Sequence, residues 1–111
     1  MLRHVAVFTF TPETTDAQVQ ALIEGLGRLP NVIPEIREYR FGPDVGEAEG
    51  NDAFAVVADF EDVEAYRRYA GHPAHQELIV NLIRPILATR HAVQFVPASP
   101  CGPEPGSAPA T

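Results

Sequence analysis

LRHVAVFTF, residues 2–10, combines β-branched and aromatic residues and predicts a β-strand. Successive side chains of a strand point to opposite faces of a sheet. One face of this strand carries Leu2, His4, Ala6, Phe8 and Phe10, and the other carries Arg3, Val5, Val7 and Thr9. Both faces are mostly apolar, so this strand predicts a sheet that is covered on both sides.

An amphipathic helix is expected next, over residues 15–29. Thr15 and Gln18 have the spacing of a capping box at its start, and Pro30 lies just past its expected end. Its apolar residues recur at spacings of three and four and form one stripe. These residues are Val19, Leu22, Ile23, Leu26 and Leu29.

Three more strands are expected. Residues 34–41 predict a strand with interleaved charges, broken by Gly42-Pro43-Asp44 and followed by an acidic loop over residues 45–51. Residues 53–60 (AFAVVADF) predict a strand that is apolar on both faces. Residues 89–96 (TRHAVQFV) predict the last strand.

The second helical region, between the third and fourth strands, is predicted to be broken. Residues 62–70 form a short helix with Asp62 as N-cap, and Gly71 stops it. His72 caps a new helix that has Pro73 in its first turn, where a missing N–H has little effect. Pro85 is expected to end this helix near Arg84.

The order of these elements is β-α-β-β-α-β, the ferredoxin-like arrangement, and the fold class is α+β. Helices cover only one face of such a sheet. Because the other face is apolar as well, we expect two sheets to close face to face in a homodimer. The predicted architecture is therefore a ferredoxin-like sandwich that forms a dimeric α/β barrel.

Length and composition bound the possible functions. The 111 residues suit one domain over residues 1–96, and residues 97–111 (PASPCGPEPGSAPAT) predict a disordered tail. The formal net charge of −7 argues against nucleic acid and anionic membrane partners. One cysteine, Cys101, excludes an intrachain disulfide. With no signal peptide or membrane span readable, we expect a soluble cytoplasmic protein.

Candidate catalytic side chains gather at the helix break, Tyr69-Ala-Gly-His72-Pro-Ala-His75. His75 lies in the first turn of the new helix, where the helix end disfavours imidazolium and keeps a general base neutral. The phenol of Tyr69 can donate to a carbonyl oxygen. His4, in an apolar strand, needs a hydrogen-bond partner if it is buried. The alternative for each is a packing residue, and for His72 a solvent-exposed cap.

Metal and cofactor sites are not predicted. The spacing of His72 and His75, with His4 as a third ligand, permits a metal site, but HExxH and CxxC are absent. No GxGxxG or Walker loop is present, so no nucleotide cofactor is implied. His91, in the last strand, is expected to be structural only.

These residues resemble the stress-responsive dimeric A/B barrel (Dabb) family. The resemblance is carried by His4 in its strand, by Gly42-x-Asp44-Val45, and above all by the Tyr69-x-x-His72-Pro73-x-His75 element. It implies a ferredoxin-like fold and a homodimer. The family includes plant stress-associated proteins and a plant cyclase that closes a polyketide ring by aldol condensation without a cofactor.

By this resemblance His75 is the catalytic base, Tyr69 orients a carbonyl group and His4 is a further pocket histidine. The family's cyclase has another histidine early in its third strand, where this chain has Phe54, which implies a more apolar pocket. We expect His72, Phe8, Phe54 and Val56 to contact a small hydrophobic carbonyl ligand.

Three functions follow as hypotheses. The first is a cofactor-independent cyclase or lyase acting on a polyketide-like substrate with a His base and a Tyr donor. The second is a non-enzymatic stress-response or ligand-binding protein with the same fold. The third is a cofactor-free monooxygenase, which needs a substrate that activates oxygen itself.

Overall fold

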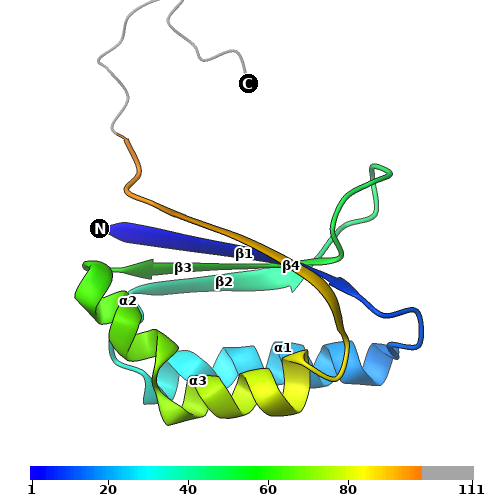
Figure 1. The fold of residues 1–111 in the computed structure, drawn as a ribbon, viewed down its shortest axis with the longest axis horizontal. Coiled ribbons are helices and arrows are strands. Elements are labelled where there is room, and N and C mark those ends of the chain that lie inside the picture. Colours follow the sequence, from blue (N-terminus) through cyan, green and yellow to red (C-terminus); the bar gives the residue numbers. More distant parts are fainter. Residues whose placement is uncertain (99–111) are drawn as a thin grey trace, which may run out of the picture.

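The computed structural model describes residues 1–98, and the tail expected over residues 97–111 lies almost entirely outside them. These residues form four strands and three α-helices, the last extended by a short π-helix, in two layers (Figure 1). The strands are β1 (Leu2–Phe10), β2 (Glu38–Pro43), β3 (Phe54–Phe60) and β4 (Leu87–Phe95). The helices are α1 (Asp16–Val32), α2 (Val63–Ala70) and α3 (Pro73–Leu78), the last of which continues as a π-helix, η1 (Ile79–Ile83).

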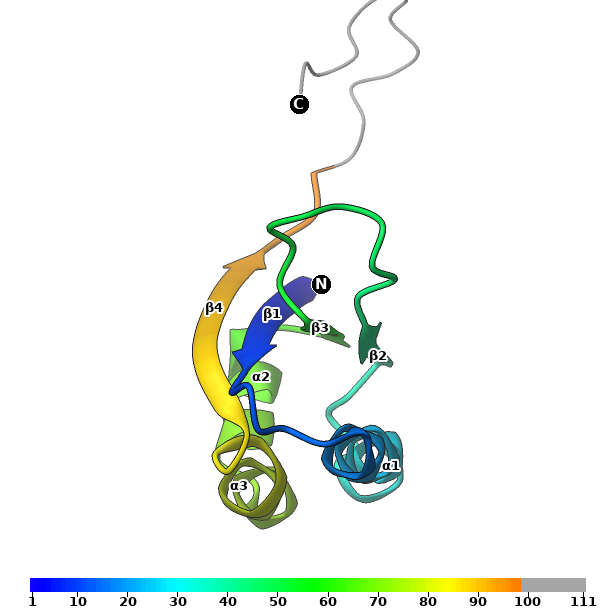
Figure 2. The same cartoon turned by 90° about the vertical axis from the view of Figure 1, so that its right-hand side faces the viewer.

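The sheet confirms the predicted ferredoxin-like topology. Its order is β2-β3-β1-β4, and every neighbouring pair is antiparallel. Val5 at the centre of β1 lies opposite Val57 of β3 and Val93 of β4, which fixes the register of the three strands. All helices lie on one side of this sheet (Figure 1), and β4, at one edge of the sheet, curves down toward α3 (Figure 2).

The core lies between the sheet and the helices. The face of β1 with His4, Ala6 and Phe8 is buried against them, as the alternation predicts. From α1 the predicted stripe contributes buried leucines, and Ile33 extends it just beyond the helix. Phe54 and Phe60 of β3 complete the layer. Removing these apolar groups from water is the main force that holds the helices on the sheet.

The predicted helix caps are confirmed. Thr15 and Gln18 form the capping box, with the Gln18 N–H donating to Thr15 Oγ1 at 3.2 Å and the Thr15 N–H donating to Gln18 Oε1 at 2.9 Å. Asp62 accepts from the N–H of Ala65 at 2.8 Å. His72 Nδ1 accepts from the N–H of Ala74 at 3.0 Å. Four side chains therefore set where the helices begin.

Two predicted boundaries are wrong. The helix expected to stop before Pro30 runs through it to Val32, because in the last turn proline removes a single hydrogen bond, and Ile33 N–H still donates to Leu29 C=O at 2.9 Å. The second strand is Glu38–Pro43 rather than residues 34–41. Residues 34–37 lie before the strand and include a turn. Pro43, which was expected to break the strand, is its last residue, and proline is tolerated there because β2 is an edge strand.

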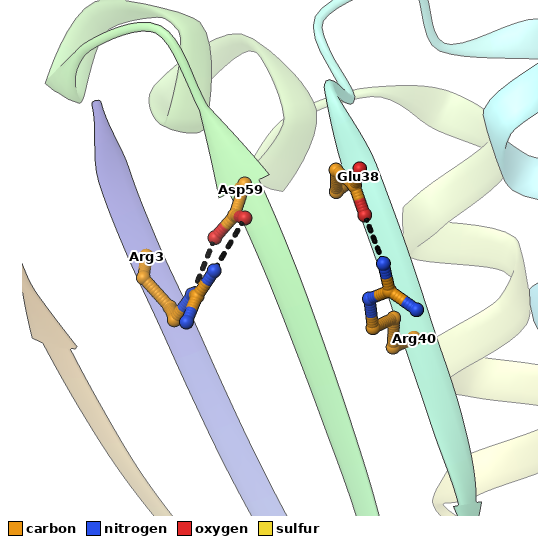
Figure 3. A network of polar contacts seen from close by, with 4 residues as sticks. All are labelled: Arg3, Glu38, Arg40 and Asp59. Atoms are coloured by element: carbon orange, nitrogen blue, oxygen red, sulfur yellow. Dashed lines mark hydrogen bonds and ion pairs between the residues drawn. The ribbon is translucent and has the colours of Figure 1, made fainter. Parts of the chain in front are cut away.

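The sheet face opposite the helices, here called the open face, has an apolar centre. Val5, Val7 and Val57 are half-buried there, whereas Val93 and Phe95 of β4 are 55% and 41% exposed. Two charged pairs lie on the same face (Figure 3). Arg3 makes two hydrogen bonds to Asp59, at 2.8 and 2.9 Å, and Arg40 pairs with Glu38 at 2.8 Å.

Across residues 1–98, no helix has both the length and the apolar character that crossing a membrane requires.

Candidate functional site

A cavity of about 360 Å³ opens between the helix-facing side of the sheet and the α2–α3–η1 segment. Nine of its lining residues are apolar, among them Ala6, Phe8 and Val56 from the sheet. The other eight are polar, aromatic or basic: His4, Tyr39, Tyr66, Tyr69, His75, Gln76, Arg84 and Arg90. Apolar walls with a few convergent polar groups are typical of a small-molecule site.

His75 is placed in this cavity by the helix break. The cap made by His72 and the ring of Pro73 fix the first turn of α3, and His75 follows directly. Its Nδ1 lies 3.2 Å from the carbonyl oxygen of Ala70. A carbonyl only accepts, so Nδ1 carries the proton of the neutral ring and Nε2 keeps its lone pair. This is the tautomer that a general base requires.

Burial lowers the pKa of His75 below its ordinary value, a shift that the hydrogen bond to Ala70 opposes and the charge of Arg90 reinforces. The direction agrees with the prediction, but its first cause is burial and not the helix end. The imidazole is therefore neutral near pH 7.

Tyr69, at the end of α2, lies against His75, with ring centroids 4.2 Å apart. Its hydroxyl is hydrogen-bonded to that of Tyr39 on β2 at 2.7 Å. Burial raises the pKa of Tyr69 to about 12, so its phenol keeps its proton at neutral pH. The cavity thus holds a proton donor and a proton acceptor side by side.

His4 approaches the same cavity from β1. The amide nitrogen of Gln94 on β4 lies 3.0 Å from His4 Nδ1 and donates to it, which leaves the proton of the neutral ring on Nε2. Burial lowers the pKa of His4 to about 4, and the charges of Arg90 and His75 add to this shift. The hydrogen-bond partner that the sequence required is therefore Gln94, the residue directly opposite in the register.

The structure brings together five of the seven predicted site residues: His4, Phe8, Val56, Tyr69 and His75 line one cavity. The other two lie outside its lining. His72 uses Nδ1 to cap α3. Phe54 is buried behind the wall, where its ring stacks on that of Phe8 at 6.4 Å.

Sequence reasoning missed Tyr39, Gln94 and Arg90. Each lies on β2 or β4, and each reaches the site only through strand pairing: Tyr39 lies opposite Ala58, Gln94 opposite His4 and Arg90 opposite Phe8. The alternation Arg90, Ala92, Gln94 along β4 was the available signal. The ferredoxin-like order places β4 beside β1, but the register that sets Arg90 opposite Phe8 and Gln94 opposite His4 was not readable from β4 alone.

Within residues 1–98, no three His, Cys, Asp or Glu side chains come together in a group that could hold a metal ion.

The fold and the cavity together define a class: small ferredoxin-like α+β domains with a pocket between sheet and helices. Residues 2–97 match the family model of the Stress responsive A/B Barrel Domain (Dabb), and the chain belongs to this family.

Relatives support this assignment. Olivetolic acid cyclase of Cannabis sativa is 30% identical over 76 residues, which are 67% of this chain and 75% of the cyclase. The stress-response A/B barrel domain-containing protein HS1 of Arabidopsis thaliana is 28% identical over 78 residues, 68% of this chain and 72% of HS1. A dimeric ferredoxin-like protein of Thermobifida fusca superposes with a TM-score of 0.79 at 45% identity, over 85% of this chain and 88% of that one.

Proposed function

We propose that this protein is a cofactor-independent cyclase or lyase that acts on a small hydrophobic carbonyl substrate, in the first instance by aldol-type ring closure of a polyketide-like chain. The observation that carries the proposal is the pairing of His75 and Tyr69 inside an apolar cavity, with ring centroids 4.2 Å apart. The relationship to olivetolic acid cyclase supports the reaction class.

His75 would act as the base. Its Nε2 removes a proton from a carbon between two carbonyl groups, and the electrons of that C–H bond form an enolate. The enolate oxygen accepts a hydrogen bond from the hydroxyl of Tyr69. While Tyr69 donates to the ligand, Tyr39 donates to Tyr69, so the two phenols act as one chain of hydrogen bonds.

Ring closure then needs no further reagent. The enolate carbon attacks a second carbonyl carbon of the same chain, so one C–C bond forms and the attacked oxygen becomes an alkoxide. The imidazolium of His75 returns its proton to that alkoxide. The cyclic product keeps every atom of the linear substrate, and the base is regenerated.

The apolar walls supply orientation. A flexible chain reacts slowly because few of its conformations bring the two reacting carbons together, and a pocket that folds the chain removes this entropic barrier. Phe8 and Val56 form the wall on the sheet side, with Phe54 supporting Phe8 from behind. His4 offers its Nε2–H to a ligand from β1.

Linear tetraketide thioesters test this proposal, because without a catalyst they cyclise to lactones. We expect the wild-type protein to shift the products toward carbocycles, and His75→Ala to lower that rate about a hundredfold or more. Gln20→Ala is the control, since Gln20 is exposed on α1, outside the cavity lining and away from the open face. Identical product ratios for wild type and His75→Ala would refute the role of His75.

A second candidate is a ligand-binding stress-response protein without catalysis. One observation favours it: Phe54 occupies the early β3 position at which the family resemblance implies a histidine in the cyclase. The same assay separates the two candidates, because a ligand-binding protein without catalysis would bind the thioesters without changing their products.

The proposal includes a homodimer built on the open face. Its apolar centre, with Val93 at 55% and Phe95 at 41% exposure, is a surface that a second sheet would cover. The related Thermobifida fusca protein is dimeric. Pairing two copies of one face gives a closed two-fold dimer.

Val93→Glu tests the dimer, with Val80→Glu on η1 as a control of similar exposure, 49%. Light scattering is expected to give a dimer for the wild type and for Val80→Glu, and a monomer for Val93→Glu. A wild-type protein with the 12.1 kDa mass of one chain would refute the dimer.

A further inference from the structure

The mouth of the cavity is basic. Among the residues that line the cavity, only Gln76, Arg84 and Arg90 are exposed, and two of these three carry a positive charge. Arg84 is the C-cap of η1, and Arg90 lies opposite Phe8 in the register, on the helix-facing side of β4. Two exposed cations on the lining of one cavity stand out in a chain with a formal net charge of −7.

No acidic group in the described part of the chain neutralises these two arginines. Not one of the residues lining the cavity is Asp or Glu. Elsewhere, five of the eight arginines form ion pairs with carboxylates: Arg3, Arg37, Arg40, Arg67 and Arg68. Within residues 1–98, neither Arg84 nor Arg90 has such a partner at ion-pair distance.

Arg90 lines the same cavity as His4, His75 and Tyr69. Burial lowers the pKa values of His4 and His75, and the charge of Arg90 adds to this lowering; in Tyr69 it opposes the rise in pKa that burial causes. One guanidinium therefore acts on His4, His75 and Tyr69 alike. An anion bound to Arg90 would thus share the cavity with the His75–Tyr69 pair.

We propose that the ligand of this cavity carries an oxyanion group at one end, bound by Arg90 with Arg84 beside it, while its carbonyl chain extends inward to His75 and Tyr69. The substrate class is thus an anionic oxo compound and not a neutral ketone. This inference rests on the proposed function and deepens it. A guanidinium offers paired N–H donors that match a carboxylate or a phosphate, so both groups share the required chemistry.

Three probes with one alkylphenyl body separate these sources: 4-hexylbenzoate, 4-hexylphenyl phosphate and the neutral 4-hexylbenzamide. Titration calorimetry on the full chain measures each Kd. We expect an anionic probe to bind at least tenfold more tightly than the amide, because hydrogen bonds to a charged group are stronger than those to a neutral one. A preference for the benzoate identifies a carboxylate, and a preference for the phosphate identifies a phosphate ester.

Arg90→Leu should abolish this preference, and Arg90→Lys should keep part of it. Arg28→Leu on α1 is the matched control and should keep all of it, since Arg28 lies outside the lining of this cavity. Circular dichroism shows whether each variant is folded. Arg90→Lys also keeps the inference testable if Arg90→Leu fails to fold.

Failure of this inference is distinct from failure of the catalytic proposal. If the anionic probes bind no better than the amide, or if no probe binds, the inference is wrong, whatever the thioester assay shows. If the preference depends on Arg90 but His75→Ala leaves thioester products unchanged, the anion site stands and the catalytic role of His75 falls.

Discussion

The buried imidazole of His4 should make the protein lose stability in mild acid. In the folded state only 5% of this residue is exposed, and burial holds its pKa at about 4, against 6.5 for a free histidine. Between these two pH values the unfolded chain binds a proton that the folded chain does not. Lowering the pH through this range therefore favours the unfolded state.

The size of the effect follows from the two pKa values. Proton linkage gives a loss in the free energy of unfolding of about 2 kcal/mol by pH 5 and about 3 kcal/mol by pH 4, relative to pH 7. His75 adds a loss of the same sign, because its pKa is also lowered by burial. Asp59 contributes only in stronger acid, since Arg3 holds its pKa below 3.8.

His4→Gln isolates the contribution of His4, because glutamine does not titrate and its amide oxygen can accept from Gln94. Urea unfolding followed by far-UV circular dichroism at pH 7, 6, 5 and 4 measures the stability of both proteins at one fixed protomer concentration. We expect the wild type to lose about 3 kcal/mol more than His4→Gln between pH 7 and pH 4. Equal losses would show that His4 is not held neutral by burial.

Three further outcomes are expected. Thr15→Ala removes the cap of α1 and should lower the free energy of unfolding by about 1 kcal/mol, measured by urea unfolding, whereas Thr15→Ser should lower it little. Tyr39→Phe removes the partner of Tyr69 and should lower kcat about tenfold with little change in KM, and an unchanged kcat would contradict a positioning role. In the pH dependence of kcat/KM, the midpoint of the acidic limb should lie below pH 6.5, because burial lowers the pKa of His75 and activity requires the neutral imidazole.

Local chemistry made much of the fold predictable. The bounds of β1, the capping box at Thr15 and the caps at Asp62 and His72 depend on neighbouring residues, and each is confirmed. The end of α1 was mispredicted because the burial of Leu29 and Ile33 outweighs the hydrogen bond lost at Pro30. The π-helix η1, which follows Leu78, has no signal in its neighbouring residues comparable to these helix caps.

The candidate site was predictable where one short segment carries it. Tyr69 and His75 are separated by a single helix break, so their approach follows from local geometry. Tyr39 and Arg90 reach the cavity through strand pairing across the sheet. The sequence of one strand does not specify its register with a strand that is distant along the chain. The roles of all these residues remain predictions for the assays above.

The alternation of side chains along β1 ties two properties of the protein together. His4 faces the cavity, and its neighbour Val5 faces the open side of the sheet. A one-residue deletion or insertion near the start of this strand would exchange the two faces, placing valine in the pocket and histidine in the proposed interface. Ligand binding and self-association would then be lost in a single step, so length changes in β1 should be far rarer among functional variants than substitutions.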